Sequence, residues 1–260
     1  MRLHKTTLAL IAICLASVQM QAADNNSLKI LWIGNSYSYY NELPNTVKDI
    51  AASQNIKLSI TRFLKGGERF AGHVKNPELI KALRRGGWDF VILQGYSSTP
   101  AYSTESVVRD IYPLAHTLDS LAKAHSPKCH VVYYMTWGHK NGNLRQTDYP
   151  LDDTYDLMQE RIKTTYIEMA YMNNGWCAPV GMAWQRVRKE YPKVQLYRDD
   201  NYHPSLIGSY LAANVIFTTL FQRHYQTKVT TGLPIEQAII LQLIAQQTVF
   251  NNLRLLNIKK

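Results

Sequence analysis

The stretch Leu28–Ile50, LKILWIGNSYSYYNELPNTVKDI, decides the fold of this chain. It opens with an apolar run, LKILWIG, passes through the small polar turn Gly34-Asn35-Ser36, and continues into a segment with apolar residues at helical spacing: Leu43, Val47, Ile50 and Ala51. This pattern predicts a strand, a tight turn and a helix. A strand that is apolar on both faces is typical of a parallel sheet covered by helices on both sides.

Ser36 follows the predicted strand directly, at its carboxyl end. Parallel α/β sheets place ligands and chemistry at that edge, so Ser36 stands where a nucleophile would stand. The alternative is that Asn35 and Ser36 serve only as turn and helix-cap residues, because both types form local hydrogen bonds with the backbone. The stretch alone leaves both interpretations open.

The rest of the chain continues the alternation of strand and helix. Further strands are expected within four stretches: 57–67, 90–93, 130–143 and 177–184. Helices are expected over five: 77–83, 105–124, 155–172, 205–221 and 234–250. The segment 205–221 is apolar on most of its surface and should be buried. The order predicts an α/β fold, a three-layer α/β/α sandwich with about five parallel strands.

Length and composition favour one domain with a sizeable core, since the chain has 260 residues and 46% hydrophobic content. The formal net charge of +10 is scattered along the chain. Its short basic clusters, KALRR at 81–85 and RVRK at 186–189, are explained by solvated helix faces. The sequence also contains no nucleic-acid-binding motif, so we expect no nucleic acid partner.

The first residues have the features of a secretory signal: basic MRLHK, apolar TTLALIAICLASV and small residues near Ala22 and Ala23. We therefore expect residues 1–23 to be removed and residues 24–260 to form a single exported domain, periplasmic or extracellular. Lipoprotein processing at Cys14 is less favoured, because Ile13 stands where a small residue is needed. No later stretch is long and apolar enough to span a bilayer, so we expect no stable membrane insertion.

Two cysteines remain after cleavage, Cys129 and Cys177. Two are too few for a zinc site of paired CxxC motifs. Each lies just before an expected strand, so a disulfide between neighbouring strands is possible in an oxidising compartment. The alternative is that their Cβ atoms point apart, which would forbid a bond.

Polar residues stand where ester hydrolysis needs them, at the ends of expected strands. They are Ser36 after the first strand, Gly66-Gly67 after the second, Gln94 after the third, and Asp200 with His203 before the buried helix. A carboxylate three residues before a histidine can fold back to orient the imidazole. Taken singly, each feature also has a structural explanation in turns or packing.

In order and spacing these residues resemble the SGNH (GDSL-like) serine hydrolase superfamily. Gly34-Asn35-Ser36 matches its nucleophile block, Gly67 its second block, and Asp200 with His203 its last block. Gln94 in LQG replaces the usual asparagine of the third block, as in a bacterial branch that also has GNSY or GNSF.

The resemblance implies a flavodoxin-like sandwich and a serine esterase or acyl-transfer mechanism without cofactor or metal. It implies that Ser36 is the nucleophile, His203 the base and Asp200 the group that orients it. The oxyanion hole would be formed by the backbone of Ser36 and Gly67 with the side chain of Gln94.

Aromatic residues in the loops at this edge favour a sugar as the carrier of the ester, because tyrosine and tryptophan combine an apolar face with a polar edge. They are Tyr37, Tyr39, Tyr40, Tyr96, Tyr102, Trp137 and Tyr202, of which about half should belong to the core. We therefore expect an esterase that hydrolyses small acyl esters, chiefly O-acetyl, on carbohydrates. The alternatives are a non-catalytic carbohydrate-binding protein of this fold and a polysaccharide O-acetyltransferase.

Four further polar residues could face a substrate: His73, His139, Asp152 and Asp153. No metal-ligand spacing connects them, so solvated loop or helix positions are the favoured interpretation.

Overall fold

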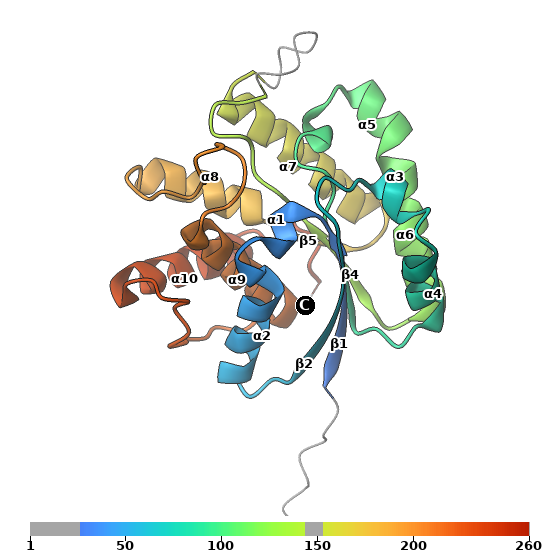
Figure 1. Ribbon diagram of the computed structural model, residues 1–260, viewed down its shortest axis with the longest axis horizontal. Helices are drawn as coiled ribbons and strands as arrows, with labels where there is room; N and C mark the ends of the chain where they lie inside the picture. Colours follow the sequence, from blue (N-terminus) through green and yellow to red (C-terminus); the bar gives the residue numbers. More distant parts are fainter. Residues whose placement is uncertain (1–26, 144–152, 260) are drawn as a thin grey trace, which may run out of the picture.

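The computed structural model describes residues 27–143 and 153–259. Five parallel strands form one sheet in the order β2-β1-β3-β4-β5 (Figure 1). The strands are β1 (Leu28–Gly34), β2 (Leu58–Leu64), β3 (Phe90–Leu93), β4 (His130–Tyr134) and β5 (Trp176–Ala178). This is the flavodoxin-like strand order.

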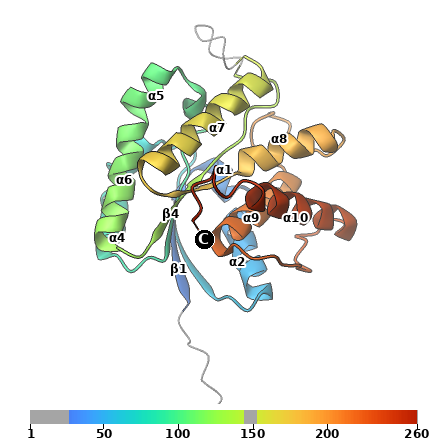
Figure 2. The same ribbon diagram turned by 180° about the vertical axis from the view of Figure 1, so that it is seen from behind.

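Helices cover both faces of the sheet, which confirms the expected three-layer sandwich (Figures 1 and 2). One side holds α2 (Leu43–Ser53), α8 (Val180–Glu190), α9 (Leu206–Phe221) and α10 (Ile235–Phe250). The other side holds α3 (Phe70–His73), α4 (Pro77–Arg85), α5 (Thr104–Asp110), α6 (Tyr112–His125) and α7 (Tyr155–Met172). Short helical turns complete the elements: α1 (Ser36–Tyr39), η1 (Tyr40–Glu42) and η2 (Thr99–Ala101).

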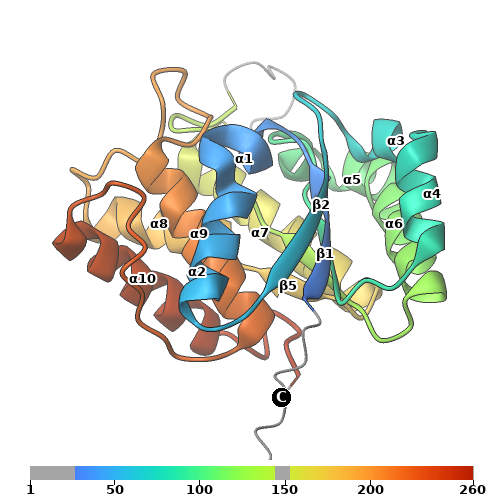
Figure 3. The same cartoon turned by 60° about the horizontal axis from the view of Figure 1, so that its bottom comes forward.

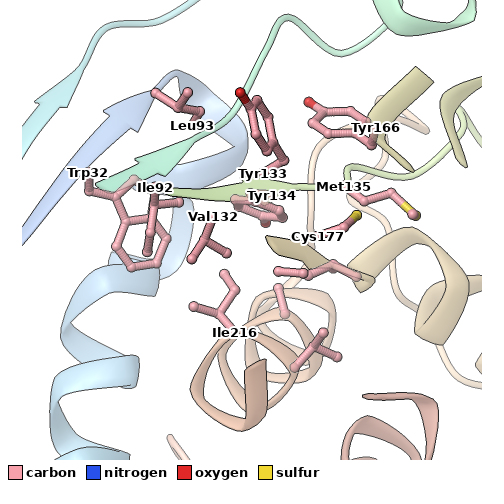
Figure 4. Close-up of a cluster of buried hydrophobic side chains, with 14 of the residues drawn as sticks. Trp32, Ile92, Leu93, Val132, Tyr133, Tyr134, Met135, Tyr166, Cys177 and Ile216 are labelled. Atoms are coloured by element: carbon pink, nitrogen blue, oxygen red, sulfur yellow. The ribbon is translucent and has the colours of Figure 1, made fainter. Parts of the chain in front are cut away.

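The central strands are buried on both faces, as their continuous apolar sequence predicts. Val132 of β4 and Ile216 of α9 lie on one side of the sheet, whereas Tyr133 and Tyr166 lie on the other (Figure 4). Helix α9 is buried along almost its whole length, because α2, α8 and α10 pack around it. The expectation of a buried helix over 205–221 is therefore confirmed.

The strand order reverses between β1 and β3, and this reversal fixes the position of a crevice. Helix α2 leads from β1 to β2 on one face of the sheet, and α3 with α4 lead back to β3 on the other. The chains leaving β1 and β3 therefore diverge, which opens a crevice at the carboxyl ends of the two strands. Helix α1, which begins at Ser36, lies at this edge (Figure 3).

Two expected elements differ from the observed ones, and proline accounts for both. The helix expected over 105–124 is two helices that meet at Ile111, and Pro113 lies in the first turn of the second, where its missing N–H costs nothing. The strand expected over 177–184 is only Trp176–Ala178, because Pro179 cannot donate to a ladder and the chain turns into α8 at Val180.

The possible disulfide is absent, since Cys129 and Cys177 are both free and buried. Cys177 lies within β5, not before it, and pairs in register with Tyr133 of β4. Cys129 is four residues upstream of Tyr133, which separates the two cysteines by ~13 Å along the strand direction. That separation exceeds the Cα distance a disulfide accepts.

Several expectations concern residues outside the described ranges, namely the signal segment 1–23 with Cys14, and Asp152. Among the described residues, no helix combines the length and apolar character that crossing a membrane requires.

We expect Ile216→Ala to lower the free energy of unfolding by about 2–5 kcal/mol, because it leaves a cavity among fully buried side chains. Ile239→Ala on α10 is the matched control, since 47% of Ile239 is exposed. Urea titration followed by circular dichroism measures both. Equal losses in the two variants would contradict the packing of α9 described above.

Candidate active site

Ser36, His203 and Asp200 form one chain of hydrogen bonds at the carboxyl edge of the sheet. The distance from Ser36 Oγ to His203 Nε2 is 2.9 Å, and that from His203 Nδ1 to Asp200 Oδ2 is 2.8 Å. Because an ionised carboxylate only accepts hydrogen bonds, Nδ1 carries the proton, and Nε2 is then free to accept from the Ser36 hydroxyl. The structure thus brings together the three residues that the sequence analysis grouped.

Asp200 is held in its ionised form by its own loop. Its Oδ1 accepts the backbone N–H groups of Tyr202 and His203 at 3.1 and 2.9 Å. Partial burial acts to raise the pKa of Asp200, but the bonds from Tyr202 and His203 outweigh it, and the pKa lies below its usual value. A negative charge therefore stays next to the imidazole.

Asn35 fixes the turn that carries Ser36. Its side-chain oxygen caps α1 by accepting the N–H of Tyr37, and its side-chain nitrogen donates to the carbonyls of Glu68 and Gly95 at 3.0 and 3.3 Å. One carboxamide thus ties together the segments that follow β1, β2 and β3. The cap interpretation of Asn35 is correct, but it describes only one of these contacts.

Gln94 differs from its expected role, because its side chain is fully buried and its polar atoms are engaged inside the protein. Its oxygen accepts the N–H of Asn35 and the hydroxyl of Ser38, both at 2.9 Å, and its nitrogen donates to the side chain of Asn35 and to the carbonyl of Gly95. Gly34 allows this approach, since a Cβ there would lie 2.6 Å from the Gln94 oxygen. In this structure Gln94 braces the turn that carries Ser36, and its amide hydrogens are taken by Asn35 and Gly95.

Asn41 connects the segment after Ser36 with the segment after His203. Its side-chain nitrogen donates to the carbonyls of Pro204 and Ser205 and to the hydroxyl of Ser209, at 2.8 to 3.1 Å. Asn41 adopts a left-handed conformation, with φ 53°, which asparagine tolerates better than most residues. These bonds keep Ser36 and His203 at a fixed separation, and the role of Asn41 could not be predicted from residue spacing.

A column of stacked aromatic rings contacts the loop that carries His203, called the histidine loop. Tyr37 stacks on Trp137 at 4.5 Å, and Trp137 stacks on Trp184 at 3.9 Å. Trp137 also donates its ring N–H to the carbonyl of Tyr202, next to His203. Tyr37 and Trp137 are therefore part of the core, although Tyr37 also borders the cavity over Ser36 that is described next.

A cavity of about 290 Å³ opens directly over Ser36 and His203. Gly66 and Gly67 also line it, and Gly67 has a left-handed φ of 69° that favours glycine. Within the described residues, the backbone N–H groups of Ser36 and Gly67 donate to no protein acceptor. Two residues that line this cavity thus have unengaged backbone donors, which is what an oxyanion hole requires.

A second cavity of about 410 Å³ adjoins the first and shares Tyr96, Ser97 and Tyr202 with it. Four further aromatic residues around the two cavities are at least partly exposed, unlike the buried Tyr37: Tyr39, Tyr96, Tyr102 and Tyr202. Tyr40 lies beside His203, with 4.5 Å between ring centres, and lines neither cavity. Of the expected aromatic residues, only Tyr37 and Trp137 are buried, which is fewer than the expected half.

The remaining polar candidates fall in different places. His73 is not solvated as expected, because it is 2% exposed and its Nε2 donates to the carbonyl of Gly34 at 3.0 Å. Burial is the main cause that lowers the pKa of His73. His139 lines the second cavity, and Asp153 is exposed. Throughout the described ranges, no three histidine, cysteine or acidic side chains gather as metal ligands would.

The chain is similar in structure to several solved hydrolases. A proposed SGNH hydrolase from Slackia heliotrinireducens has TM-score 0.61 and 27% identity, with 75% of this chain and 100% of that chain covered. A DUF4886 family protein from Bacteroides uniformis has TM-score 0.69 and 20% identity, with 86% and 95% covered. A variant of an acetyl xylan esterase from Geobacillus stearothermophilus has TM-score 0.55 and 14% identity, with 77% and 97% covered.

No protein-family model matches the chain, and no curated protein matches it either. The similarity of fold therefore carries the comparison, and it supports a hydrolase of the SGNH, or GDSL-like, type.

We expect the unfolding free energies of the wild type and Asp200→Asn to converge as the pH falls below about 4. The fold lowers the pKa of Asp200, so the ionised carboxylate stabilises the native state. This stabilisation is complete above the pKa of the unfolded chain, about 3.9. It is lost as the pH falls through the lower pKa of the folded state. Urea titrations from pH 7 to pH 3 measure the difference. Asp49→Asn, on the exposed face of α2, is the control for loss of one charge. A difference that grows toward acid would contradict the arrangement.

We expect Gln94→Leu to lower the free energy of unfolding by about 1–3 kcal/mol or more, because it leaves the buried polar groups of Asn35 and Ser38 without their partner. A glutamine that only donated to a bound substrate would give the opposite pattern, with turnover reduced and stability intact. Thermal unfolding of the ligand-free variant separates the two roles.

Proposed function

We propose that this chain, whose fold is similar to that of SGNH (GDSL-like) hydrolases, is an exported serine esterase that hydrolyses small acyl esters, chiefly O-acetyl, on carbohydrates. The observation that carries the proposal is the hydrogen-bonded chain from Ser36 Oγ through His203 to Asp200. Such a chain activates a hydroxyl that is otherwise a weak nucleophile.

In the proposed reaction, His203 Nε2 takes the proton of Ser36 as Ser36 Oγ attacks the ester carbonyl carbon. The tetrahedral intermediate collapses when the bond to the alkoxy oxygen breaks, and His203 returns the proton to that oxygen, which releases the alcohol. Water then attacks the acyl-serine with His203 again as base, and the products are a carboxylic acid and free Ser36. Asp200 stays ionised and orients the imidazole.

The oxyanion of this reaction is assigned to the backbone N–H groups of Ser36 and Gly67. Both border the 290 Å³ cavity and neither has an acceptor within the described protein. Gln94 is assigned an indirect role, because its amide hydrogens are taken by Asn35 and Gly95. It positions the turn and does not touch the substrate.

Two features favour a small acyl group on a sugar. The cavity over Ser36 is short and bounded by Gly66, Gly67 and the ring of Tyr39, which suits acetyl better than a long chain. The partly exposed rings of Tyr96 and Tyr202 beside it suit the apolar C–H face and hydroxyl edge of a pyranose. The similar protein from Geobacillus stearothermophilus is described as an acetyl xylan esterase, which agrees with this assignment.

We expect Ser36→Ala to reduce hydrolysis of 4-nitrophenyl acetate by at least ~10³-fold, as removal of the nucleophile does in other serine hydrolases. Ser120→Ala, on the exposed part of α6, should retain full turnover. Turnover by the wild type should also fall steeply from acetyl to butyryl esters, and acetate should be released from at least one acetylated glycan.

The alternatives give other results in the same experiments. A non-catalytic sugar-binding protein would leave every ester intact. An acetyltransferase would release acetate slowly unless an acceptor sugar were added. Retained activity in Ser36→Ala would exclude the proposed mechanism altogether.

A further inference from the structure

The second cavity lies where the alcohol part of the substrate must leave. His203 Nε2 returns its proton to the leaving oxygen, so the alcohol has to lie on the histidine side of Ser36. The 410 Å³ cavity is lined by Asp200, Asn201 and Tyr202, the three residues that directly precede His203. Under the proposed function, it is therefore the subsite for the sugar that carries the ester.

Arg69 also lines this cavity. Its guanidinium lies over the ring of Tyr96, 4.7 Å from the ring centre. A cation–π contact uses none of the guanidinium N–H donors, so they remain available to a ligand. Stacking also limits the conformations of a long side chain, which reduces the entropy lost when a ligand binds.

The charge of Arg69 has no counterpart in the described part of the chain. Its side chain forms no ion pair or hydrogen bond with any residue in 27–143 or 153–259. Two carboxylates of this region have other partners: Glu68 pairs with Lys65 at 3.0 Å, and Asp200 is bound to His203 and two backbone N–H groups. Asp200 is also the one acidic residue among those that line the cavity.

We propose that Arg69 makes this subsite selective for an anionic sugar, with a carboxylate that the guanidinium binds through two parallel N–H donors. A carboxylate matches that planar pair of donors, whereas a neutral hydroxymethyl group would leave the guanidinium without a partner. The hydroxyls of Ser97 and Ser98 and the rings of Tyr96 and Tyr102 line the rest of the cavity and suit the remainder of the pyranose. The substrate class is thus an acylated uronic acid.

Binding of two sugars that differ only at C6 tests the proposal. Methyl galactosiduronate and methyl galactoside are titrated into the protein at low ionic strength, and affinities are measured by NMR chemical-shift changes. We expect the uronate to bind the wild type about 10- to 100-fold more tightly, the range of a charge-assisted hydrogen bond. Arg69→Gln should abolish this preference, and Arg69→Lys should retain part of it.

Arg84→Gln is the matched control, because it removes the same charge from an exposed position on α4 that lines neither cavity. It should keep the preference for the uronate. Equal affinity for the two sugars in the wild type, a preference that survives in Arg69→Gln, or no binding of either sugar would overturn the proposal. Tighter binding of galactose 6-sulfate than of the uronate would overturn the assignment of a carboxylate.

The sugar-binding experiment requires no hydrolysis, so it can fail or succeed independently of the proposed esterase activity. Turnover of 4-nitrophenyl acetate, measured on the same variants, tests that activity separately. Loss of the uronate preference with intact turnover would reject the subsite alone. The uronate preference without any turnover would reject the esterase and leave an anionic sugar site.

Discussion

The buried carboxamides of Asn35 and Gln94 connect the turns at the carboxyl edge of the sheet. Gln94 accepts the backbone N–H of Asn35 and donates to its side chain, and Asn35 reaches on to Glu68 and Gly95. The turns after β1, β2 and β3 are therefore joined through groups shielded from water, where a hydrogen bond is strong and a missing partner is costly. The position of Ser36 relative to Gly67 depends on these bonds.

The histidine loop is fixed to the same framework from two other directions. Asn41 reaches it from the segment after Ser36, and Trp137 and Lys140 bind it from the loop after β4. These contacts hold His203 within 2.9 Å of Ser36. If the two residues act together in catalysis, a framework that fixes their separation lowers the reorganisation that the reaction requires.

Much of the fold could be predicted from periodicity. The apolar runs at Leu28–Gly34 and Phe90–Leu93 locate central strands, and the apolar surface of the segment 205–221 predicts a buried helix, because burial on all sides leaves little room for polar residues. The grouping of Ser36 with His203 was predicted from their order and spacing, through the resemblance to the SGNH superfamily.

The roles of individual polar side chains could not be predicted in the same way. Gln94 and His73 find their partners, Asn35 and Gly34, only in the folded chain, so sequence spacing cannot distinguish a brace from a substrate contact. The separation of Cys129 and Cys177 along the strand direction likewise depends on the register of β4 and β5. Strand β5 contains only Trp176–Ala178, which is too short for its register to be predicted from the sequence.

The central claim is that Ser36 is a nucleophile activated by the arrangement around it, and covalent capture tests that claim most directly. A fluorophosphonate reacts with an activated serine and remains bound to it, so mass spectrometry after trypsin digestion can locate the site. The account predicts one label per chain, on Ser36 within the tryptic peptide Ile30–Lys48, and no label after denaturation. A folded protein that stays unlabelled, or that carries the label on another residue, would contradict it.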